Sequence, residues 1–180
     1  MDIATLAFTH APVGLAYAED RTIRRCNLRF AEIFGGAPED FADLPLKRLY
    51  PSAEDYERIG AQGLEVMRAT GRYDDERIMQ RLTGVAFWCR VRGESLTPEA
   101  PFRRSVWSFS DLSAARPVVE LTAREREVAM LTAQGRTSKE IGREIGLSYR
   151  TVELYRARLQ EKFGARNLAD LVAKFSGLPH

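Results

Sequence analysis

The chain has 180 residues, a formal net charge of +2 at pH 7 and a hydrophobic content of 44%. This length suits one or two domains, and the composition is ordinary for a globular protein. No apolar run approaches the length of a membrane span, and no basic-then-apolar leader opens the chain. The two cysteines and two histidines argue against a disulfide framework or a metal cluster. We therefore expect a reduced, cytoplasmic protein with no membrane partner and no bound metal.

The first part of the chain mixes helix and strand patterns in an order typical of an α+β domain. Helical patterns run from Asp2 to Phe8, from the cap Asn27 to Gly35 and from the cap Ser52 to Gly71, with small helical turns between 38 and 50. Strand patterns occupy 13–17, 21–26, 72–80, 85–93 and 103–112. This order predicts a five-stranded antiparallel sheet with its helices on one face, forming a domain over residues 1–113.

A short linker, 114–120, is predicted next, because Pro117 should break a continuous helix there. Residues 121–180 are predicted to form a second, all-α domain, because they contain four helical patterns. Their caps are Thr122, Thr137, Ser148 and Asn167, and Gly135, Gly146 and Gly164 stand where helices should end. Glu125 and Glu140 complete two capping boxes. The glycine turn 146–148 between the second and third helices describes a helix-turn-helix, an element that offers one helix to a DNA groove.

The third of these helices has two faces of different character. At about 100° per residue, one apolar stripe is formed by Val152, Tyr155, Leu159 and Phe163, and we expect it to pack into the helical bundle. The opposite face carries Arg150, Glu153, Leu154, Ala157, Arg158 and Glu161. An apolar Leu154 and a small Ala157 on an exposed face fit a helix whose backbone closely approaches a major groove.

Five pieces of this segment have a familiar order and spacing: LTAREREV (121–128), Gly135, KEI (139–141), LSYRTVE (147–153) and LQEKFGARNLADLV (159–172). With them the segment resembles the LuxR/GerE-type helix-turn-helix family of bacterial transcription factors, except that Tyr155 stands where the family usually has a histidine. The resemblance implies that Glu153, Leu154 and Ala157 face the bases, with Glu153 accepting from a cytosine amino group and Leu154 touching a thymine methyl. The residues expected to bond DNA phosphates are Lys139, Arg150, Thr151, Arg156 and Arg158.

Two N-terminal segments, PVGLAYAEDRTIRRCNLRFAEIFG (12–35) and VWSFSDLS (106–113), resemble a PAS domain. This resemblance implies a sensory or dimerising module with a small pocket between the sheet and the long helix, open to an unidentified small molecule. The candidate lining residues are Phe30, Phe34, Leu49, Leu64, Met67, Phe87, Cys89 and Trp107. The open alternative is that these side chains simply fill the core. Haem-type PAS domains place a histidine near the pocket, and the flavin photosensor type has a cysteine in the turns before the long helix. Here neither histidine lies on the long helix or the last three strands, and no cysteine occurs in 38–50, so the resemblance disfavours both cofactors.

Two exposed apolar surfaces are candidates for a homodimer interface. Their residues are Ile3 and Leu6 in the first helix, and Leu168, Leu171, Val172 and Phe175 in the last. The alternative for the last helix is that it packs into its own four-helix core.

The residues offer little for catalysis, because no Ser/His/Asp set and no phosphate-cradling glycine loop is available. We therefore expect a sequence-specific regulator of transcription, not an enzyme, that binds double-stranded DNA as a homodimer, with RNA polymerase as a candidate further partner. Two alternatives stay open: a sigma-factor-like promoter module, and a protein-interaction adaptor that does not bind DNA.

Overall fold

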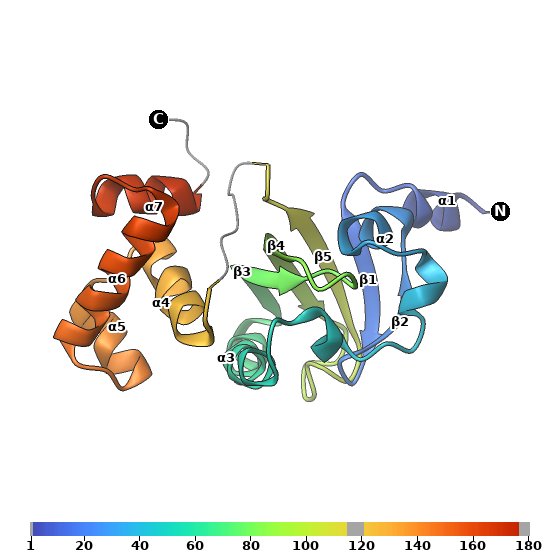
Figure 1. Cartoon of the computed structure of the whole chain (residues 1–180). Coiled ribbons are helices and arrows are strands. Elements are labelled where there is room, and N and C mark those ends of the chain that lie inside the picture. The colour runs from blue at the N-terminus through green and yellow to red at the C-terminus, as the bar shows by residue number, and fades with distance from the viewer. Residues whose placement is uncertain (1, 115–120, 177–180) are drawn as a thin grey trace. The chain divides into compact units, whose positions relative to one another are not determined.

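The computed structural model of the chain describes residues 2–114 and 121–176, with side chains up to 175 (Figure 1). The predicted linker therefore lies, apart from residue 114, outside the described residues. The chain divides into two compact units, Met1–Asp111 and Leu112–His180, here called the N-terminal and C-terminal units. None of the described helices is long and apolar enough to cross a membrane.

The N-terminal unit is built on a five-stranded sheet with the strand order β2-β1-β5-β4-β3. Its strands are β1 (Gly14–Glu19), β2 (Thr22–Cys26), β3 (Arg72–Gln80), β4 (Ala86–Ser95) and β5 (Ser105–Asp111), and all neighbours are antiparallel. The predicted α+β sheet is confirmed, and the predicted bounds of β3 match those observed. β4 begins one residue later than predicted, because Val85 is exposed next to a turn in which Gly84 has a φ of +86°.

Helices cover the inner face of this sheet (Figure 1). They are α2 (Leu28–Phe34), α3 (Ala53–Thr70) and two 3₁₀ turns at Pro38–Phe41 and Leu46–Leu49, while the leading α1 (Ile3–Thr9) buries none of its residues. Buried Asn27 joins α2 to β1: its carboxamide oxygen accepts from the backbone N–H of Leu15 at 2.8 Å and of Phe30 at 2.9 Å. Asn27, which caps α2, therefore also ties this helix to β1.

The row of β1, β5 and β4 residues around Trp107 shapes the inner face of the sheet. Trp107 pairs with Ala16 on one side and Gly93 on the other. A Cβ on residue 93 would lie 2.4 Å from the Trp107 ring, so the indole lies across β4 at a position that only glycine leaves open.

The C-terminal unit consists of α4 (Ala123–Ala133), α5 (Ser138–Ile145), α6 (Tyr149–Phe163) and α7 (Leu168–Ser176). All four predicted caps are confirmed by hydrogen bonds to the first turns, and both capping boxes form. The fully buried residues of this unit are Val128, Ala129, Ile141, Val152, Leu159, Leu171 and Phe175.

The turn between α5 and α6 depends on two glycines. Gly146 ends α5 with a φ of +70°, as predicted from its place in the sequence. Gly142 lies one turn earlier, where a Cβ would come within 2.6 Å of the Leu147 carbonyl oxygen. The turn therefore folds back directly over α5, and this close approach sets where α6 begins.

Candidate nucleic-acid interface

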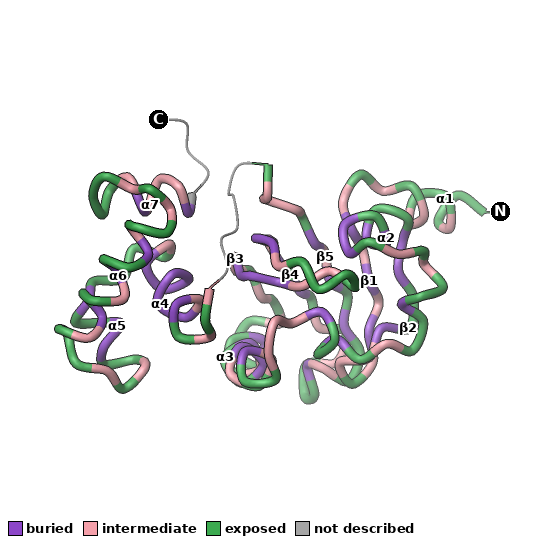
Figure 2. Tube along the Cα trace, viewed as in Figure 1, coloured by how far each residue is buried: buried purple, intermediate pink, exposed green. Residues whose placement is uncertain are grey.

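Helix α6 presents the two faces that its sequence predicts (Figure 2). Val152 and Leu159 are fully buried, and Tyr155 and Phe163 are half-buried. On the other side Leu154 is 52% exposed, in line with exposed Glu153 and Ala157. The outer face of α6 thus combines a carboxylate, a branched apolar side chain and a small residue. This set can accept from a base amino group, contact a thymine methyl and let the helix backbone come close to DNA.

Three of the expected phosphate ligands are exposed cations around this face: Lys139, Arg150 and Arg158. Among the residues that the structure describes, no ion pair joins any of them to a carboxylate, so their charges are available to an external anion. Thr151 is half-buried and its hydroxyl lies 2.8 Å from that of the cap Ser148. Their contacts with DNA remain predictions.

Arg156 does not belong to this set, and its assignment as a phosphate ligand is corrected. Its side chain is only 7% exposed. Its Nε donates to the Thr132 hydroxyl at 3.3 Å and an Nη to the Arg136 carbonyl, both at the end of α4 or just beyond it. Burial lowers the pKa of Arg156. The sequence contained the signal: residue 156 follows Val152 by four positions and precedes Leu159 by three, which places it on the buried stripe.

The carboxylate of Glu153 is held in place from α5. The Ser138 hydroxyl donates to Glu153 Oε1, and Arg156 Nη1 lies 3.9 Å from the same oxygen. Ser138 is buried, whereas the Glu153 side chain is 47% exposed. Sequence reasoning missed Ser138, although the adjacent Thr137 already supplies the cap and leaves the second hydroxyl without a local task.

Tyr155, which stands in the place of the family's usual histidine, is covered by Arg158, whose guanidinium lies 5.9 Å from its ring centroid. This contact keeps Arg158 beside the outer face of α6. A cation over an aromatic ring contributes about 0.5–1 kcal/mol at an exposed site.

The predicted dimer surface of α7 is smaller than expected. Leu171 and Phe175 are fully buried, and the Phe175 ring meets Phe163 edge-on at a centroid distance of 5.1 Å. These two residues belong to the core of the C-terminal unit, which corrects their assignment to an interface. Leu168 is 39% exposed and Val172 is half-buried, so they stay available.

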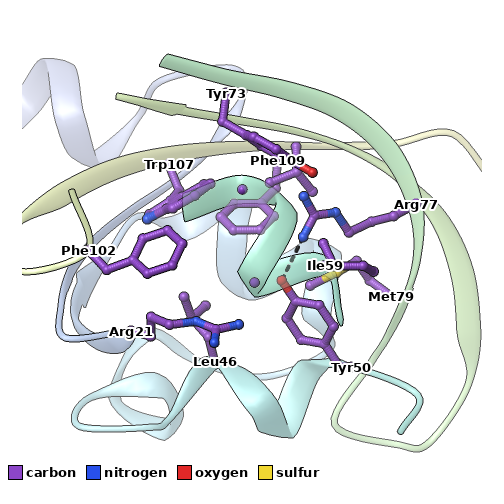
Figure 3. A pocket seen from close by; sticks show the side chains of 13 residues that line it. Arg21, Leu46, Tyr50, Ile59, Tyr73, Arg77, Met79, Phe102, Trp107 and Phe109 are labelled. Carbon is purple, nitrogen blue, oxygen red and sulfur yellow. Dashed lines mark hydrogen bonds between the residues drawn. The ribbon is translucent and has the colours of Figure 1, made fainter. Parts of the chain in front are cut away.

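The N-terminal unit contains a cavity between α3 and the sheet (Figure 3). Its lining comprises Arg21, Leu46, Tyr50, Ile59, Gly60, Gly63, Tyr73, Arg77, Met79, Val91, Phe102, Trp107 and Phe109. The volume open to the centre of a water-sized sphere is about 20 Å³. A cavity thus lies in the place where a pocket was expected, but of the predicted lining residues Trp107 alone contributes to it.

The other seven predicted lining residues lie elsewhere, which corrects the expected lining. Phe30, Phe34 and Phe87 belong to an aromatic cluster completed by Phe41 and Phe109, with neighbouring ring centroids 4.6–6.4 Å apart. The residues outside both the cluster and the cavity are Leu49, Leu64, Met67 and Cys89, of which Leu64 is half-buried and the rest are buried. These seven side chains pack in the N-terminal unit and do not line the cavity, as the alternative interpretation expected.

The two cysteines show no sign of thiolate chemistry. Burial raises the pKa of Cys26 to about 11 and that of Cys89 to about 12, so both thiols are protonated at neutral pH. Among the described residues, no three side chains of His, Cys, Asp or Glu are grouped so that they could hold a metal ion.

Two family models match separate parts of the chain, one in each of its two units. The family model described as bacterial regulatory proteins, luxR family, matches residues 119–175, and a PAS domain model matches residues 3–70. The transcriptional regulatory protein UhpA of Escherichia coli (strain K12) is 50% identical over 54 residues, which are 30% of this chain and 28% of UhpA.

Two solved structures cover one or both units. The PAS domain, in complex with ethanol, of a transcriptional regulator in the LuxR family from Burkholderia thailandensis is 45% identical, with a TM-score of 0.60 over 63% of this chain and 99% of that domain. The VqmA dimer of Vibrio cholerae is 22% identical, with a TM-score of 0.56 over 96% of this chain and 86% of VqmA, and shows likeness of fold alone. The chain spans 19%, 57% and 28% of the length of three curated relatives.

Proposed function

Because the chain belongs to the LuxR family of bacterial regulatory proteins and carries a PAS domain ahead of its helix-turn-helix, we propose that it is a sequence-specific, DNA-binding regulator of transcription. The single observation that carries the proposal is the outer face of α6. There an exposed Leu154 and Ala157 lie beside the Glu153 carboxylate, near cations that no ion pair within the described residues joins to a carboxylate. Its target, the bacterial chromosome, places the proposed activity in the cytoplasm.

In this proposal the residues of the interface have two separate tasks. Glu153, Leu154 and Ala157 read base edges in the major groove, and Lys139, Arg150, Thr151 and Arg158 bond phosphates that set the register of the helix. Ser138 orients the Glu153 carboxylate before DNA arrives, which lowers the entropy lost on binding.

We further propose that the protein acts as a homodimer on a pseudo-palindromic site, since two-fold symmetry places two recognition helices in adjacent major grooves. Ile3 is 85% exposed and Leu6 42% exposed on α1, and Leu168 with Val172 remains available on α7. The PAS unit then senses a small molecule, sets the geometry of the dimer, or does both. The complex of the Burkholderia domain with ethanol supports a small-molecule role for this fold. Contact with RNA polymerase stays a prediction.

The proposal is tested by selecting bound duplexes from a random pool with the full chain and no polymerase present. We expect a two-fold motif, and Glu153→Ala should relax base preference at one position in each half-site by about 1–3 kcal/mol. No enrichment of any duplex would contradict the proposal and favour the adaptor. Enrichment that requires core polymerase would favour the sigma-factor-like module.

A second measurement separates base readers from phosphate ligands. Arg150→Ala or Arg158→Ala should weaken binding to all duplexes alike and reduce the slope of log affinity against log salt by about one. Arg166→Ala is the matched control, because Arg166 is exposed in the same unit but lies outside the proposed interface. Equal losses in all three variants would show that only net charge matters.

A further inference from the structure

The turn between β1 and β2 places an arginine where the backbone favours glycine. Asp20 and Arg21 have φ values of +47° and +61°, the left-handed conformation of a two-residue type I′ hairpin turn. Glycine is preferred at the second position because it adopts this conformation without steric cost. An arginine that occupies it suggests that its side chain has a task that offsets the strain.

That side chain turns inward and meets α3. The guanidinium carbon of Arg21 lies 3.4 Å from the ring centroid of Tyr56 and 5.3 Å from that of Phe102, and Nη2 donates to the Tyr56 carbonyl at 2.9 Å. A Cβ on Gly60 would stand 2.5 Å from both terminal nitrogens. The hairpin, α3 and the Phe102 segment are therefore all shaped around this one guanidinium.

Two arginines, Arg21 and Arg77, line the cavity (Figure 3), and their charges are balanced differently. Arg77 is paired with Asp75 at 2.7 Å and donates to the Tyr50 hydroxyl at 2.6 Å. Arg21 has the Tyr56 carbonyl and ring as neighbours, and within the described part of the chain no ion pair joins it to a carboxylate. The lining thus holds one positive charge that no carboxylate of the described residues balances in an ion pair.

The remaining lining is apolar or aromatic, including Ile59, Met79 and Trp107, and the free volume matches roughly one water molecule. A ligand must therefore be small, and it must displace a side chain to enter. Arg21 is half-buried on a long, flexible stem, so it can move outward and still present its charge at the cavity mouth.

We propose that this cavity binds a small organic monoanion, a short-chain monocarboxylate, whose carboxylate pairs with Arg21 while its alkyl group lies against the aromatic wall. A monoanion balances the single free charge, whereas a cation or a dianion would leave a buried charge without a partner. This inference rests on the sensing role proposed above and names the chemical class of the signal.

The test measures thermal unfolding of the full chain by tryptophan fluorescence, because both tryptophans, Trp88 and Trp107, belong to the N-terminal unit. Sodium propionate and sodium butyrate are compared with 1-propanol, 1-butanol and propylammonium chloride at equal ionic strength. The two acids should raise Tm saturably, by roughly 5 °C at tenfold excess over Kd. No response to either acid, or an equal response to the alcohols, would overturn the proposal.

Variants locate the response. Arg21→Gln should weaken acid binding at least about tenfold. Gly60→Ala should weaken it without changing the charge, because Gly60 lines the cavity and its added methyl group would fill the space that the ligand needs once the guanidinium has moved outward. Arg68→Gln removes the same charge from an exposed position on α3 outside the cavity and should keep the full response. If Arg21→Gln shows no cooperative transition, Gly60→Ala decides alone, and a full response in that variant overturns the assignment.

The same proteins are tested for binding to the selected duplex. A chain that binds DNA but ignores both acids overturns the cavity assignment and leaves the regulatory function standing. A chain that responds to acids but binds no duplex supports the cavity assignment and contradicts the DNA-binding function.

Discussion

Each unit of this protein buries an arginine, and the two differ in how the charge is balanced. The Arg77 side chain is 3% exposed and is paired with the Asp75 carboxylate and the Tyr50 hydroxyl. The Arg156 side chain is 7% exposed and relies on neutral oxygens, with the Glu153 carboxylate at 3.9 Å. Burial lowers the pKa of both guanidinium groups. At Arg77 the interactions with Tyr50 and Asp75 outweigh burial, so the pKa is raised. At Arg156 burial is the larger effect, so the pKa is lowered.

This difference shows two uses of a buried cation. In the N-terminal unit Arg77 lines the cavity and is paired with Asp75, and each partner needs the other because an isolated buried charge is costly. In the C-terminal unit the guanidinium clamps α6 to the end of α4 through a hydroxyl and a carbonyl. That clamp sets how the recognition helix lies on its bundle.

The comparison predicts the largest loss for Arg77→Met. Removing this cation leaves Asp75, whose side chain is 11% exposed, without its charged partner. We expect the free energy of unfolding of the N-terminal unit to fall by about 3–5 kcal/mol. Urea unfolding followed by tryptophan fluorescence measures it.

The double variant Arg77→Met, Asp75→Asn is the control for that prediction. It removes both charges and should recover part of the loss. If the double variant is as unstable as the single one, packing and not the unpaired carboxylate explains the effect.

Arg156→Met should cost less, about 1–3 kcal/mol, since it leaves a neutral carbonyl and a hydroxyl without a donor. Circular dichroism at 222 nm in urea follows the helices of both units, and tryptophan fluorescence follows the N-terminal unit alone, so the two signals together identify the transition of the C-terminal unit. Arg158→Met is the matched control: it should cost no more than about 0.5–1 kcal/mol, from the lost contact with Tyr155, and it should weaken DNA binding. Equal stability in both variants would contradict the clamp.

Ser138→Ala tests whether a hydrogen bond from a buried neutral hydroxyl orients the DNA-reading face of α6. Without the hydroxyl, the Glu153 carboxylate loses its donor from α5, and base preference at the Glu153 position should weaken by about 1 kcal/mol. Selection of bound duplexes measures the preference, with Ser138→Thr as the variant that keeps a hydroxyl. An unchanged motif for Ser138→Ala would show that Glu153 orients itself.

The smallest effect concerns pH. Burial raises the pKa of Glu125, but hydrogen bonds from Lys162 and Thr122 outweigh it, so that this pKa lies below its ordinary value. The resulting stabilisation is present above the unfolded pKa, near 4.3, and is lost as pH falls through the folded pKa. Because the Lys162 side chain is 35% exposed, we expect less than about 1 kcal/mol. Urea midpoints between pH 6 and pH 3 should fall less steeply in Lys162→Met than in the unchanged chain.

Local sequence was sufficient to predict the helices and strands and the exposed residues on the outer face of α6. Thr122, Thr137 and Ser148 satisfy backbone donors within three residues of themselves, so their role as caps does not depend on distant parts of the chain. The exposure of Leu154 and the burial of Val152 follow from helical periodicity in the same way.

The tertiary structure was needed to assign the residues whose roles depend on partners far away in the sequence. Arg156 is a clamp because Thr132 and Arg136 lie beside it, and Phe175 is core because Phe163 covers it. The cavity is lined by Arg21 and Arg77 because a hairpin turn and β3 converge under α3, far apart in sequence. Periodicity states which side of an element is apolar, but only the packed fold brings a polar side chain from one element against an opening in another.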